Sequence, residues 1–160
     1  MTVKIGDKIP SATLMQMKDG SPKPVKTDDF FAGRKVVLFA LPGAFTPTCS
    51  AKHLPGYIQL VDKIKAKGVD AIACLSVNDA FVMGAWGEQQ GAGDKVVMLA
   101  DGNGELTKAL GLEMDGSKFG MGLRSKRYAM LVEDGVVKRL EVEEPGAFSV
   151  SSAEHMLEQL

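Results

Sequence analysis

The chain has 160 residues, of which 45% are hydrophobic and 24% are charged, and its formal net charge is −1. These values are ordinary for a folded globular protein and exclude the disordered and fibrous classes. A near-neutral charge gives no electrostatic reason to expect nucleic acid or an anionic membrane as a partner. The longest apolar run, residues 36–41, is far shorter than the roughly 20 residues of a bilayer-spanning helix. The length predicts a single domain over residues 1–160.

The N-terminal residues 1–7 show neither an apolar signal core nor an arginine-rich presequence, and we therefore expect a cytoplasmic location. The chain has two cysteines, Cys49 and Cys74. An intracellular chain with so few cysteines more often uses a thiol for chemistry or packing than for a structural disulfide. The surroundings of each cysteine therefore decide its role.

Strands and helices alternate in the predicted secondary structure. Residues 35–41 form a continuous apolar run rich in Val, Leu and Phe, which is typical of a strand buried on both faces. Residues 69–77 and 95–100 repeat this composition. The intervening segments, 47–67 and 79–91, have the length and pattern of helices. This alternation predicts a mostly parallel sheet with helices on both faces.

The end of the chain has a different pattern. Residues 128–133 and 136–142 flank Asp134-Gly135, a dipeptide suited to a tight hairpin turn, so an antiparallel hairpin is predicted. A last helix is predicted from Ser151, with Glu154 three residues later as in a capping box. The whole order predicts an α/β protein with a thioredoxin-like fold, in which helices flank a central mixed sheet.

The segment after the first predicted strand, residues 42–50, has the pattern of a helix N-terminus. Thr46 is a suitable N-cap, and Pro47 is a suitable first helical residue. Cys49 then lies in the first helical turn, where unpaired backbone N–H groups and the helix dipole favour an anion. The thiolate is such an anion and is the nucleophilic form of cysteine. Since ligands bind at the carboxyl ends of strands in open α/β sheets, we interpret Cys49 as a functional thiol rather than an apolar core residue.

A second cysteine is missing from this helix start. A thioredoxin-type oxidoreductase would have Cys-x-x-Cys here, whereas the sequence has Thr46-Pro47-Thr48-Cys49. A single thiol can react with an oxidant but cannot close a local disulfide. The pattern therefore favours peroxide reduction over disulfide exchange.

The sequence resembles the peroxiredoxins, whose signature Pro-x-x-x-Thr/Ser-x-x-Cys is met by Pro42, Thr46 and Cys49. The longer string PGAFTPTCS, with HLPGY following at residues 53–57, is similar to the type II subfamily, the atypical or fifth mammalian class. Later segments resemble that subfamily in the same order: ACLSVNDAFVMGAW, LADGNGELTKALGL, RSKRYAMLVEDGVVK and FSVSSAEHML. The resemblance covers nearly the whole chain.

The resemblance implies that the protein reduces hydrogen peroxide and alkyl hydroperoxides, with Cys49 as the peroxidatic nucleophile that becomes a sulfenic acid. Negative charge builds on the leaving oxygen as the O–O bond breaks, so hydrogen-bond donors must be preset around the peroxide. By resemblance these donors are the Thr46 hydroxyl, the Arg127 guanidinium and the backbone N–H groups of Gly43, Ala44 and Cys49. Pro42 would shield the thiol from water.

Several further residues are candidates for the surroundings of the thiol. Four apolar residues are either ordinary core or a collar that receives an alkyl hydroperoxide or a partner subunit: Phe45, Phe81, Phe119 and Met121. We take Phe45 and Phe119 as candidate substrate-binding residues. Arg124 and Lys126 lie close to Arg127 in the sequence and are alternatives for the active-site cation.

His53 lies four residues after Cys49, on the same face of the predicted helix. This spacing leaves open a Cys–His pair in which the imidazole acts as a base. The alternative is that His53 packs or hydrogen-bonds behind the site. Pro55 removes one backbone hydrogen bond from the same helix and is expected to kink it.

Cys74 falls in a predicted central strand among apolar neighbours, as expected of an inert buried thiol. Residues 148–152 lack the resolving cysteine that the mammalian branch carries near its C-terminus, and this segment resembles the plant and bacterial enzymes instead. Those enzymes are recycled mainly by glutathione with glutaredoxin, sometimes by thioredoxin. The resemblance thus implies a glutathione mixed disulfide on Cys49 that glutaredoxin or a second thiol releases, and it implies a homodimer.

Two other functions remain open. A Cys–His hydrolase using Cys49 and His53 would form an acyl-enzyme, whereas a thioredoxin-fold redox sensor or chaperone would be oxidised once without turnover. No cofactor is implied, since the histidines and cysteines lack metal-ligand spacing. The acidic segment 101–105 also carries Leu106 where a calcium loop needs glycine.

Overall fold

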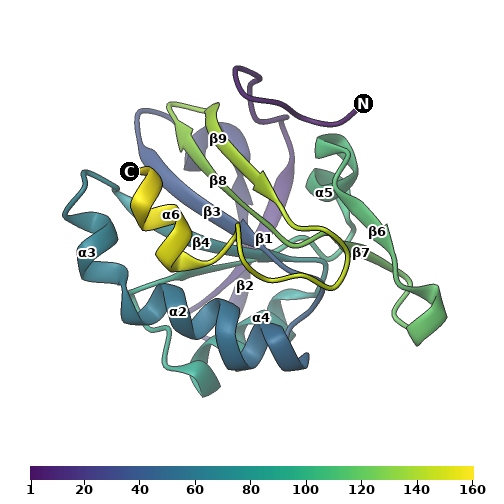
Figure 1. Ribbon diagram of the computed structural model, residues 1–160. Helices are drawn as coiled ribbons and strands as arrows, with labels where there is room; N and C mark the ends of the chain where they lie inside the picture. The colour runs from purple at the N-terminus through teal and green to yellow at the C-terminus, as the bar shows by residue number, and fades with distance from the viewer.

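The computed structural model describes residues 1–160 and contains a seven-stranded mixed sheet in the order β2-β1-β5-β4-β3-β8-β9 (Figure 1). Its strands are β1 (Thr13–Lys18), β2 (Ser21–Lys26), β3 (Lys35–Ala40), β4 (Ala71–Ser76), β5 (Val97–Ala100), β8 (Tyr128–Glu133) and β9 (Val136–Val142). The three central strands β3, β4 and β5 are parallel, and the other pairings are antiparallel. The predicted central mixed sheet flanked by helices is confirmed.

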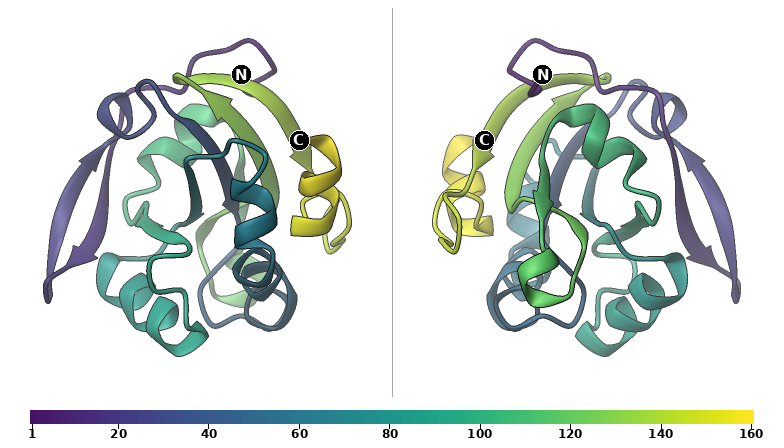
Figure 2. Two further views of the ribbon diagram at one scale, coloured as in Figure 1. Left: turned by 90° about the vertical axis from the view of Figure 1, so that its left-hand side faces the viewer. Right: turned by 90° about the vertical axis from the view of Figure 1, so that its right-hand side faces the viewer.

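Helices cover both faces of the sheet (Figure 2). They are α1 (Thr27–Phe30), α2 (Leu54–Gln59), α3 (Val61–Lys65), α4 (Ala80–Gln90), α5 (Glu105–Leu110) and α6 (Ala153–Gln159), with a π-helical turn at Cys49–His53 and a 3₁₀ turn at Ser117–Phe119. The short strands β6 (Glu113–Asp115) and β7 (Leu123–Ser125) pair to form an arm, residues 113–125, that projects from the body of the molecule (Figure 1). No helix is long and apolar enough to cross a bilayer.

Two hydrophobic clusters, one on each face, explain why the central strands are apolar throughout. In β3, Val37 and Phe39 belong to the cluster under α2, α3, α4 and α6. Their neighbours Val36 and Leu38 belong to the cluster under the N-terminal segment, α1 and α5. Because successive side chains of a strand point to opposite faces, a strand covered on both sides has no polar positions.

Most of the predicted elements are present. The three predicted apolar strands are β3, β4 and β5, and the segment 79–91 contains α4, whose N-cap Asp79 accepts from the Val82 N–H at 2.8 Å. The predicted hairpin is β8–β9. Its turn residues Asp134 (φ 47°) and Gly135 (φ 77°) both have the left-handed conformation that a two-residue hairpin turn requires.

The prediction of one continuous helix over residues 47–67 is wrong, because the helical segment is interrupted. The chain is helical from Pro47, but residues 49–53 are π-helical, and the Leu54 N–H bonds the Cys49 carbonyl five residues earlier. Pro55 is the second residue of α2, in the first helical turn, where its missing N–H is accommodated. A second break at Leu60 separates α2 from α3. The expected distortion near Pro55 therefore takes the form of a π-helical turn, a feature frequent at functional sites.

The start of the last helix is shifted by one residue from its prediction. Ser152, not Ser151, is the N-cap of α6, and its hydroxyl accepts from the His155 N–H at 3.1 Å. Ser151 is fully buried, and its hydroxyl donates instead to the Glu143 carboxylate at 2.7 Å. A tertiary hydrogen bond thus removes Ser151 from the capping position.

The N-terminal hairpin β1–β2 was not predicted. Its turn, Asp19 (φ 51°) and Gly20 (φ 80°), has the same dipeptide and conformation as the β8–β9 turn, and this was the available signal. Pro22 and Pro24 in β2 argue against a strand in the sequence, because proline has no N–H for a ladder hydrogen bond. They are tolerated since β2 is the edge strand of the sheet.

Candidate functional site

The candidate site lies at the carboxyl ends of the adjacent parallel strands β3 and β4. Residues 42–46 leave β3, and the Thr46 carbonyl accepts the first helical bond from the Ser50 N–H at 2.9 Å. Thr46 therefore occupies the N-cap position, as predicted. Cys49 falls in the first turn of the helix, and its side chain has an exposed fraction of 0%.

Arg127 reaches this buried thiol from the start of β8. Its Nη2 donates to Cys49 Sγ at 3.1 Å. Neither Arg124 nor Lys126 has a hydrogen bond to the sulfur, so the structure distinguishes Arg127 from the other two candidate cations. A charge-assisted bond of this kind is shorter and stronger when its acceptor is ionised.

His53 holds the other side of the same guanidinium. Arg127 Nη1 lies 2.9 Å from His53 Nδ1, and His53 Nε2 lies 3.0 Å from the Ser151 carbonyl oxygen. Because arginine only donates and a carbonyl only accepts, Nδ1 is the acceptor and Nε2 carries the proton. Burial, and then the charge of Arg127, lower the pKa of His53 to about 3, so the ring is neutral at physiological pH.

This arrangement opposes the Cys–His pair that the sequence spacing allowed. Both ring nitrogens of His53 are engaged, one by Arg127 and one by Ser151, and neither is hydrogen-bonded to Cys49 Sγ. The imidazole therefore has no free nitrogen with which to take a proton from the thiol. The alternative that His53 hydrogen-bonds behind the site agrees with the geometry.

A buried carboxylate anchors the segment that carries Ser151. Glu143 accepts from the Ser149 N–H at 2.7 Å, from the Ser151 N–H at 2.8 Å and from the Ser151 hydroxyl at 2.7 Å. Burial opposes ionisation of Glu143, but the hydrogen bonds from Ser151 and Ser149 outweigh it and hold the pKa of this carboxyl below its usual value. The Ser151 carbonyl also accepts from the Tyr57 hydroxyl at 2.8 Å. This chain of contacts fixes the carbonyl that orients His53.

Aromatic rings surround His53. The Phe39 ring stacks on Tyr57 at 4.0 Å between centroids and lies 4.9 Å from the imidazole, and Phe148 approaches the imidazole edge-on at 5.2 Å. The Arg127 guanidinium carbon lies 5.8 Å from the centre of the Phe148 ring, within cation–π range. These rings exclude water from the back of the site and explain the desolvation of His53.

The loop that enters the helix is internally hydrogen-bonded. The Thr46 hydroxyl donates to the Gly43 carbonyl at 2.7 Å, which leaves its oxygen free to accept. The Ala44 N–H, one of the expected peroxide donors, already donates to Asn78 Oδ1 at 3.0 Å. Asn78 follows β4 and also accepts from the Ser76 hydroxyl at 2.6 Å. Sequence reasoning missed Asn78, although its place directly after a buried strand was a signal.

The apolar candidates mostly lie at the surface. Phe45, Phe81 and Phe119 have exposed fractions of 49%, 64% and 76%, so they are not core residues. Phe45 (φ 65°) adopts the left-handed conformation and lies 6.4 Å from the Trp86 ring, while Phe119 lies at the tip of the arm. Exposed apolar side chains of this size are candidates for an interaction surface.

Cys74 is fully buried in β4, opposite Phe39 of β3, and burial raises the pKa of its thiol well above the usual value. A protonated thiol is a poor nucleophile. Both cysteines are free rather than joined in a disulfide. The inert character predicted for Cys74 agrees with this setting.

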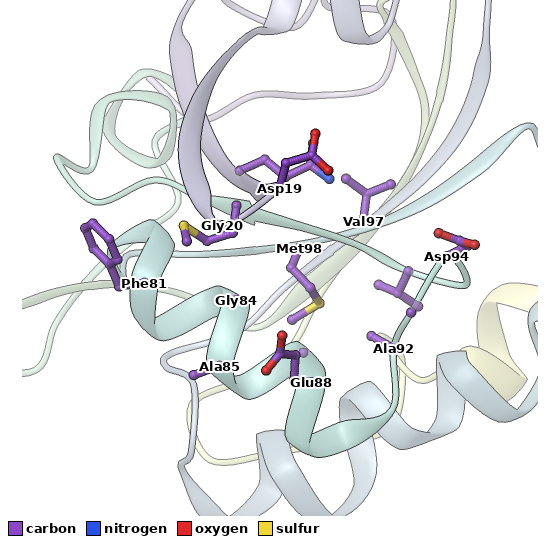
Figure 3. A pocket seen from close by; sticks show the side chains of 15 residues that line it. Asp19, Gly20, Phe81, Gly84, Ala85, Glu88, Ala92, Asp94, Val97 and Met98 are labelled. Carbon is purple, nitrogen blue, oxygen red and sulfur yellow. The ribbon is translucent and has the colours of Figure 1, made fainter.

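Two cavities flank different parts of the molecule. One of about 390 Å³ adjoins the site and is lined by Pro42, Thr48, Met114, Lys126, Arg127, Val142, Glu143, Glu144, Pro145, Gly146 and Ala147. A larger one, about 530 Å³, lies between α4, β5 and the β1–β2 turn, where Asp19, Glu88 and Met98 face it (Figure 3). It shares no residue with the loop 42–50, so its size does not make it the reaction site.

No group of three or more His, Cys, Asp and Glu side chains is clustered closely enough to hold a metal ion.

Comparison with known proteins identifies the family. The sequence profile described as Redoxin matches residues 4–157. The chain is 60% identical to "Peroxiredoxin-2E-2, chloroplastic" of Oryza sativa subsp. japonica, with 99% of this chain and 73% of that protein covered. It is 52% identical to "Peroxiredoxin-2E, chloroplastic" of Arabidopsis thaliana, with 99% and 70% covered.

A solved structure gives the same answer for the fold. The crystal structure of reduced Prx3 in complex with H₂O₂ from Vibrio vulnificus superposes with a TM-score of 0.95 at 57% identity, with 99% of each chain covered. The predicted thioredoxin-like fold and the resemblance to type II peroxiredoxins are therefore confirmed.

The expected cytoplasmic location is wrong, because the relatives at 60% and 52% identity are both named chloroplastic. These relatives point to the plastid. The composition of a folded domain and the chemistry of its site do not depend on the compartment that holds it. Residues 1–7, on which the expectation rested, therefore carried too little information.

Replacing His53 tests its role as the acceptor for Arg127. His53→Leu removes the acceptor and is expected to slow the oxidation of Cys49 by hydrogen peroxide about tenfold, the equivalent of one hydrogen bond to a charged group. His53→Gln offers both an acceptor oxygen and a donor N–H and is expected to retain most of the rate. Stopped-flow oxidation as a function of pH measures both variants. A wild-type inflection near pH 6.5 that disappears in His53→Gln would instead identify a base.

Replacing Glu143 tests the anchor of the 149–151 segment. Glu143→Gln is expected to lower the free energy of unfolding by about 1–3 kcal/mol at pH 7, because all three hydrogen bonds go to one carboxylate oxygen, Oε2, and a neutral amide oxygen accepts them more weakly. Since the pKa of Glu143 is lowered in the folded state, its contribution is present above the unfolded value of about 4.3 and is lost as the pH falls through the folded value. The difference from wild type should therefore shrink between pH 5 and pH 3 in denaturant titrations. The exposed neighbour Glu144→Gln is the control, and an equal loss in both variants would contradict the account.

Proposed function

The chain belongs to the peroxiredoxin family and is a thiol peroxidase, and from this premise we propose that Cys49 is its peroxidatic residue and that Arg127 is its catalytic cation. The observation that carries the proposal is the 3.1 Å contact between Arg127 Nη2 and Cys49 Sγ in the first turn of a helix. A permanent cation and the unpaired backbone N–H groups of a helix start both interact favourably with negative charge at this position.

In the first step the Cys49 thiolate attacks one peroxide oxygen. The S–O bond forms as the O–O bond breaks, the sulfur becomes a sulfenic acid, and the other oxygen leaves as hydroxide or alkoxide and is protonated to water or alcohol. Arg127 and the N–H groups of the first helical turn, including that of Cys49, stabilise the charge on the leaving oxygen. The Ala44 N–H is engaged by Asn78 and is left out of this set.

Two residues of the loop orient the peroxide. The Thr46 hydroxyl already donates to the Gly43 carbonyl, so its oxygen accepts a hydrogen bond from the peroxide O–H. Pro42 covers the sulfur and limits the access of water. Gly43 keeps the loop close to its neighbours, and Phe45 and Phe119 provide apolar surface for an organic hydroperoxide.

The second step is reduction by an external thiol, for which we propose glutathione. Its thiolate attacks the sulfenic sulfur: the S–S bond of a mixed disulfide on Cys49 forms as the S–O bond breaks, and the oxygen leaves as hydroxide and is protonated to water. Glutaredoxin, or alternatively thioredoxin, then attacks the mixed disulfide and releases Cys49. The absence of cysteine from residues 148–152 and the burial of Cys74 in β4 support an external rather than an internal thiol.

We also propose a homodimer that uses the exposed apolar residues Phe45, Phe81 and Phe119. Burying these side chains against a second copy of the chain would remove apolar surface from water.

Replacing each cysteine separately tests the assignment. Cys49→Ser is expected to abolish peroxidase turnover, because an alcohol does not attack the peroxide, whereas Cys74→Ser is expected to keep most of it. NADPH consumption with hydrogen peroxide, in the presence of glutathione, glutaredoxin and glutathione reductase, measures both variants. Substantial turnover by Cys49→Ser would contradict the site.

The same assay with thioredoxin and its reductase identifies the reductant. Turnover with the glutaredoxin system alone is the expected result. Turnover with thioredoxin alone, lost in Cys74→Ser, would show that Cys74 resolves the sulfenic acid. Rapid oxidation of Cys49 without turnover in either system would indicate a redox sensor.

A further inference from the structure

Arg124, three residues before Arg127, contacts the loop of residues 42–46, which we call the catalytic loop. Its Nε donates to the Met121 carbonyl at 3.0 Å, and its Nη1 donates to the Pro42 carbonyl at 3.4 Å. One guanidinium thus bridges the arm, residues 113–125, to Pro42, the second residue after β3. Among the hydrogen bonds of the structure, the bond to Pro42 is the one that joins the arm to residues 42–46.

The catalytic loop leaves space for this guanidinium. A Cβ added at Gly43 would lie 2.8 Å from Arg124 Nη1, 3.4 Å from Thr46 Cγ2 and 3.7 Å from Met121 Cε. The φ angle of Gly43 is not positive, so its conformation does not require glycine. A side chain at this position would instead meet the end of the Arg124 side chain, which passes close to the backbone.

The arm is a compact unit that such a bridge can hold in place. Its tip is closed by the Gly116 N–H bonded to the Gly122 carbonyl at 2.6 Å and by the Met121 N–H bonded to the Gly116 carbonyl at 3.0 Å. A Cβ at Gly116 would lie 2.9 Å from both the Gly122 oxygen and Met121 Cβ, which shows how tightly this tip is packed. The arm carries Phe119, exposed at its tip, and Met121, which lies over Gly43.

We propose that Arg124 is a positioning residue that fastens the arm to the catalytic loop and thereby sets the acceptance of organic hydroperoxides. The proposal rests on the proposed role of the Cys49 loop. Hydrogen peroxide is small enough to react without touching the arm. An organic hydroperoxide gains affinity by placing its alkyl or aryl group against the apolar side chains of Met121 and Phe119, so its binding depends on where the arm lies.

Arginine, rather than any cation, fits this role. Its planar guanidinium presents several N–H donors in a fixed geometry and can reach two carbonyls at once. A lysine ammonium is a point charge that cannot span the same pair from this position. A positive charge at position 124 is therefore not sufficient to hold the arm against the catalytic loop. Comparing arginine with lysine at this position thus separates bridging from a general electrostatic effect on the thiolate.

Two substitutions of Arg124 separate these possibilities. Arg124→Met and Arg124→Lys are both expected to lower kcat/KM for cumene hydroperoxide about tenfold, mainly through KM, and to change kcat/KM for hydrogen peroxide less than twofold. The pH profile of Cys49 alkylation should stay at its wild-type position, since Arg127 is untouched. Lys118→Met, which removes an exposed positive charge from the same arm, is the control and should leave both values unchanged.

Gly43→Ala provides an independent test. Its methyl group would displace only the flexible end of Arg124, so the fold should persist while the bridge to Pro42 is lost. The variant is expected to lower kcat/KM for cumene hydroperoxide to the same extent as Arg124→Met, and the double variant should be no worse than either alone.

The proposal is overturned if Arg124→Lys behaves like wild type, if both peroxides lose rate equally in Arg124→Met, or if the effects of Gly43→Ala and Arg124→Met add fully. A failure of the proposed function would look different, because the wild-type enzyme would then reduce neither peroxide. A wild type that reduces both, with an unchanged preference in the Arg124 variants, removes only the role of Arg124.

Discussion

A thiolate that is sealed from water needs a positive partner, and the structure around Cys49 depends on keeping Arg127 within 3.1 Å of its sulfur. Burying an isolated charge is costly, so a thiolate at this buried position depends on the guanidinium beside it. The guanidinium must also be held in the orientation that points one nitrogen at the sulfur. The neutral imidazole of His53 does this, since it accepts from the second nitrogen without adding a competing charge.

The remaining contacts lie progressively farther from the Cys49 sulfur, and each orients the group before it. His53 is oriented by the Ser151 carbonyl, which is fixed in turn by the Glu143 carboxylate and the Tyr57 hydroxyl. Each partner is satisfied by the next, so the network contains no unpaired buried charge. On the substrate side, the loop after β3 is held by Asn78 from the adjacent strand and by Arg124 from the arm. The parallel pair β3–β4 brings the loop and Asn78 together at the carboxyl ends of the strands, where Cys49 lies in the first turn of its helix.

Local sequence was sufficient for features whose causes are local. The N-cap at Thr46, the first-turn position of Cys49 and the Asp134-Gly135 turn depend on residues next to one another, and they were predicted correctly. The central strands were equally clear, because burial on both faces leaves an uninterrupted apolar run. The β1–β2 hairpin was missed because the prolines of an edge strand look like strand breakers.

Features that depend on distant partners could not be read from the pattern. Arg127 lies 78 residues from Cys49 in the sequence. Three cationic residues lie within positions 124–127, so the family resemblance, and not the spacing, selected Arg127 among them. The role of His53 was undecided until the Ser151 carbonyl, 98 residues away, showed which ring nitrogen carries the proton. Arg124 was considered only as a rival to Arg127, because its bond to Pro42 has no signature in the sequence.

The central claim is that a guanidinium shared between Cys49 and His53 makes the buried sulfur reactive. Trp86, the single tryptophan of the chain, donates to the Ser50 hydroxyl at 3.0 Å and so provides a fluorescence signal beside Cys49. The most direct measurement is the stopped-flow rate of Cys49 oxidation by hydrogen peroxide in Arg127→Lys, which keeps the charge but cannot bond both partners. We predict a fall of about a hundredfold or more, the scale of losing a preset donor at a developing oxyanion. A rate within threefold of wild type would contradict the account.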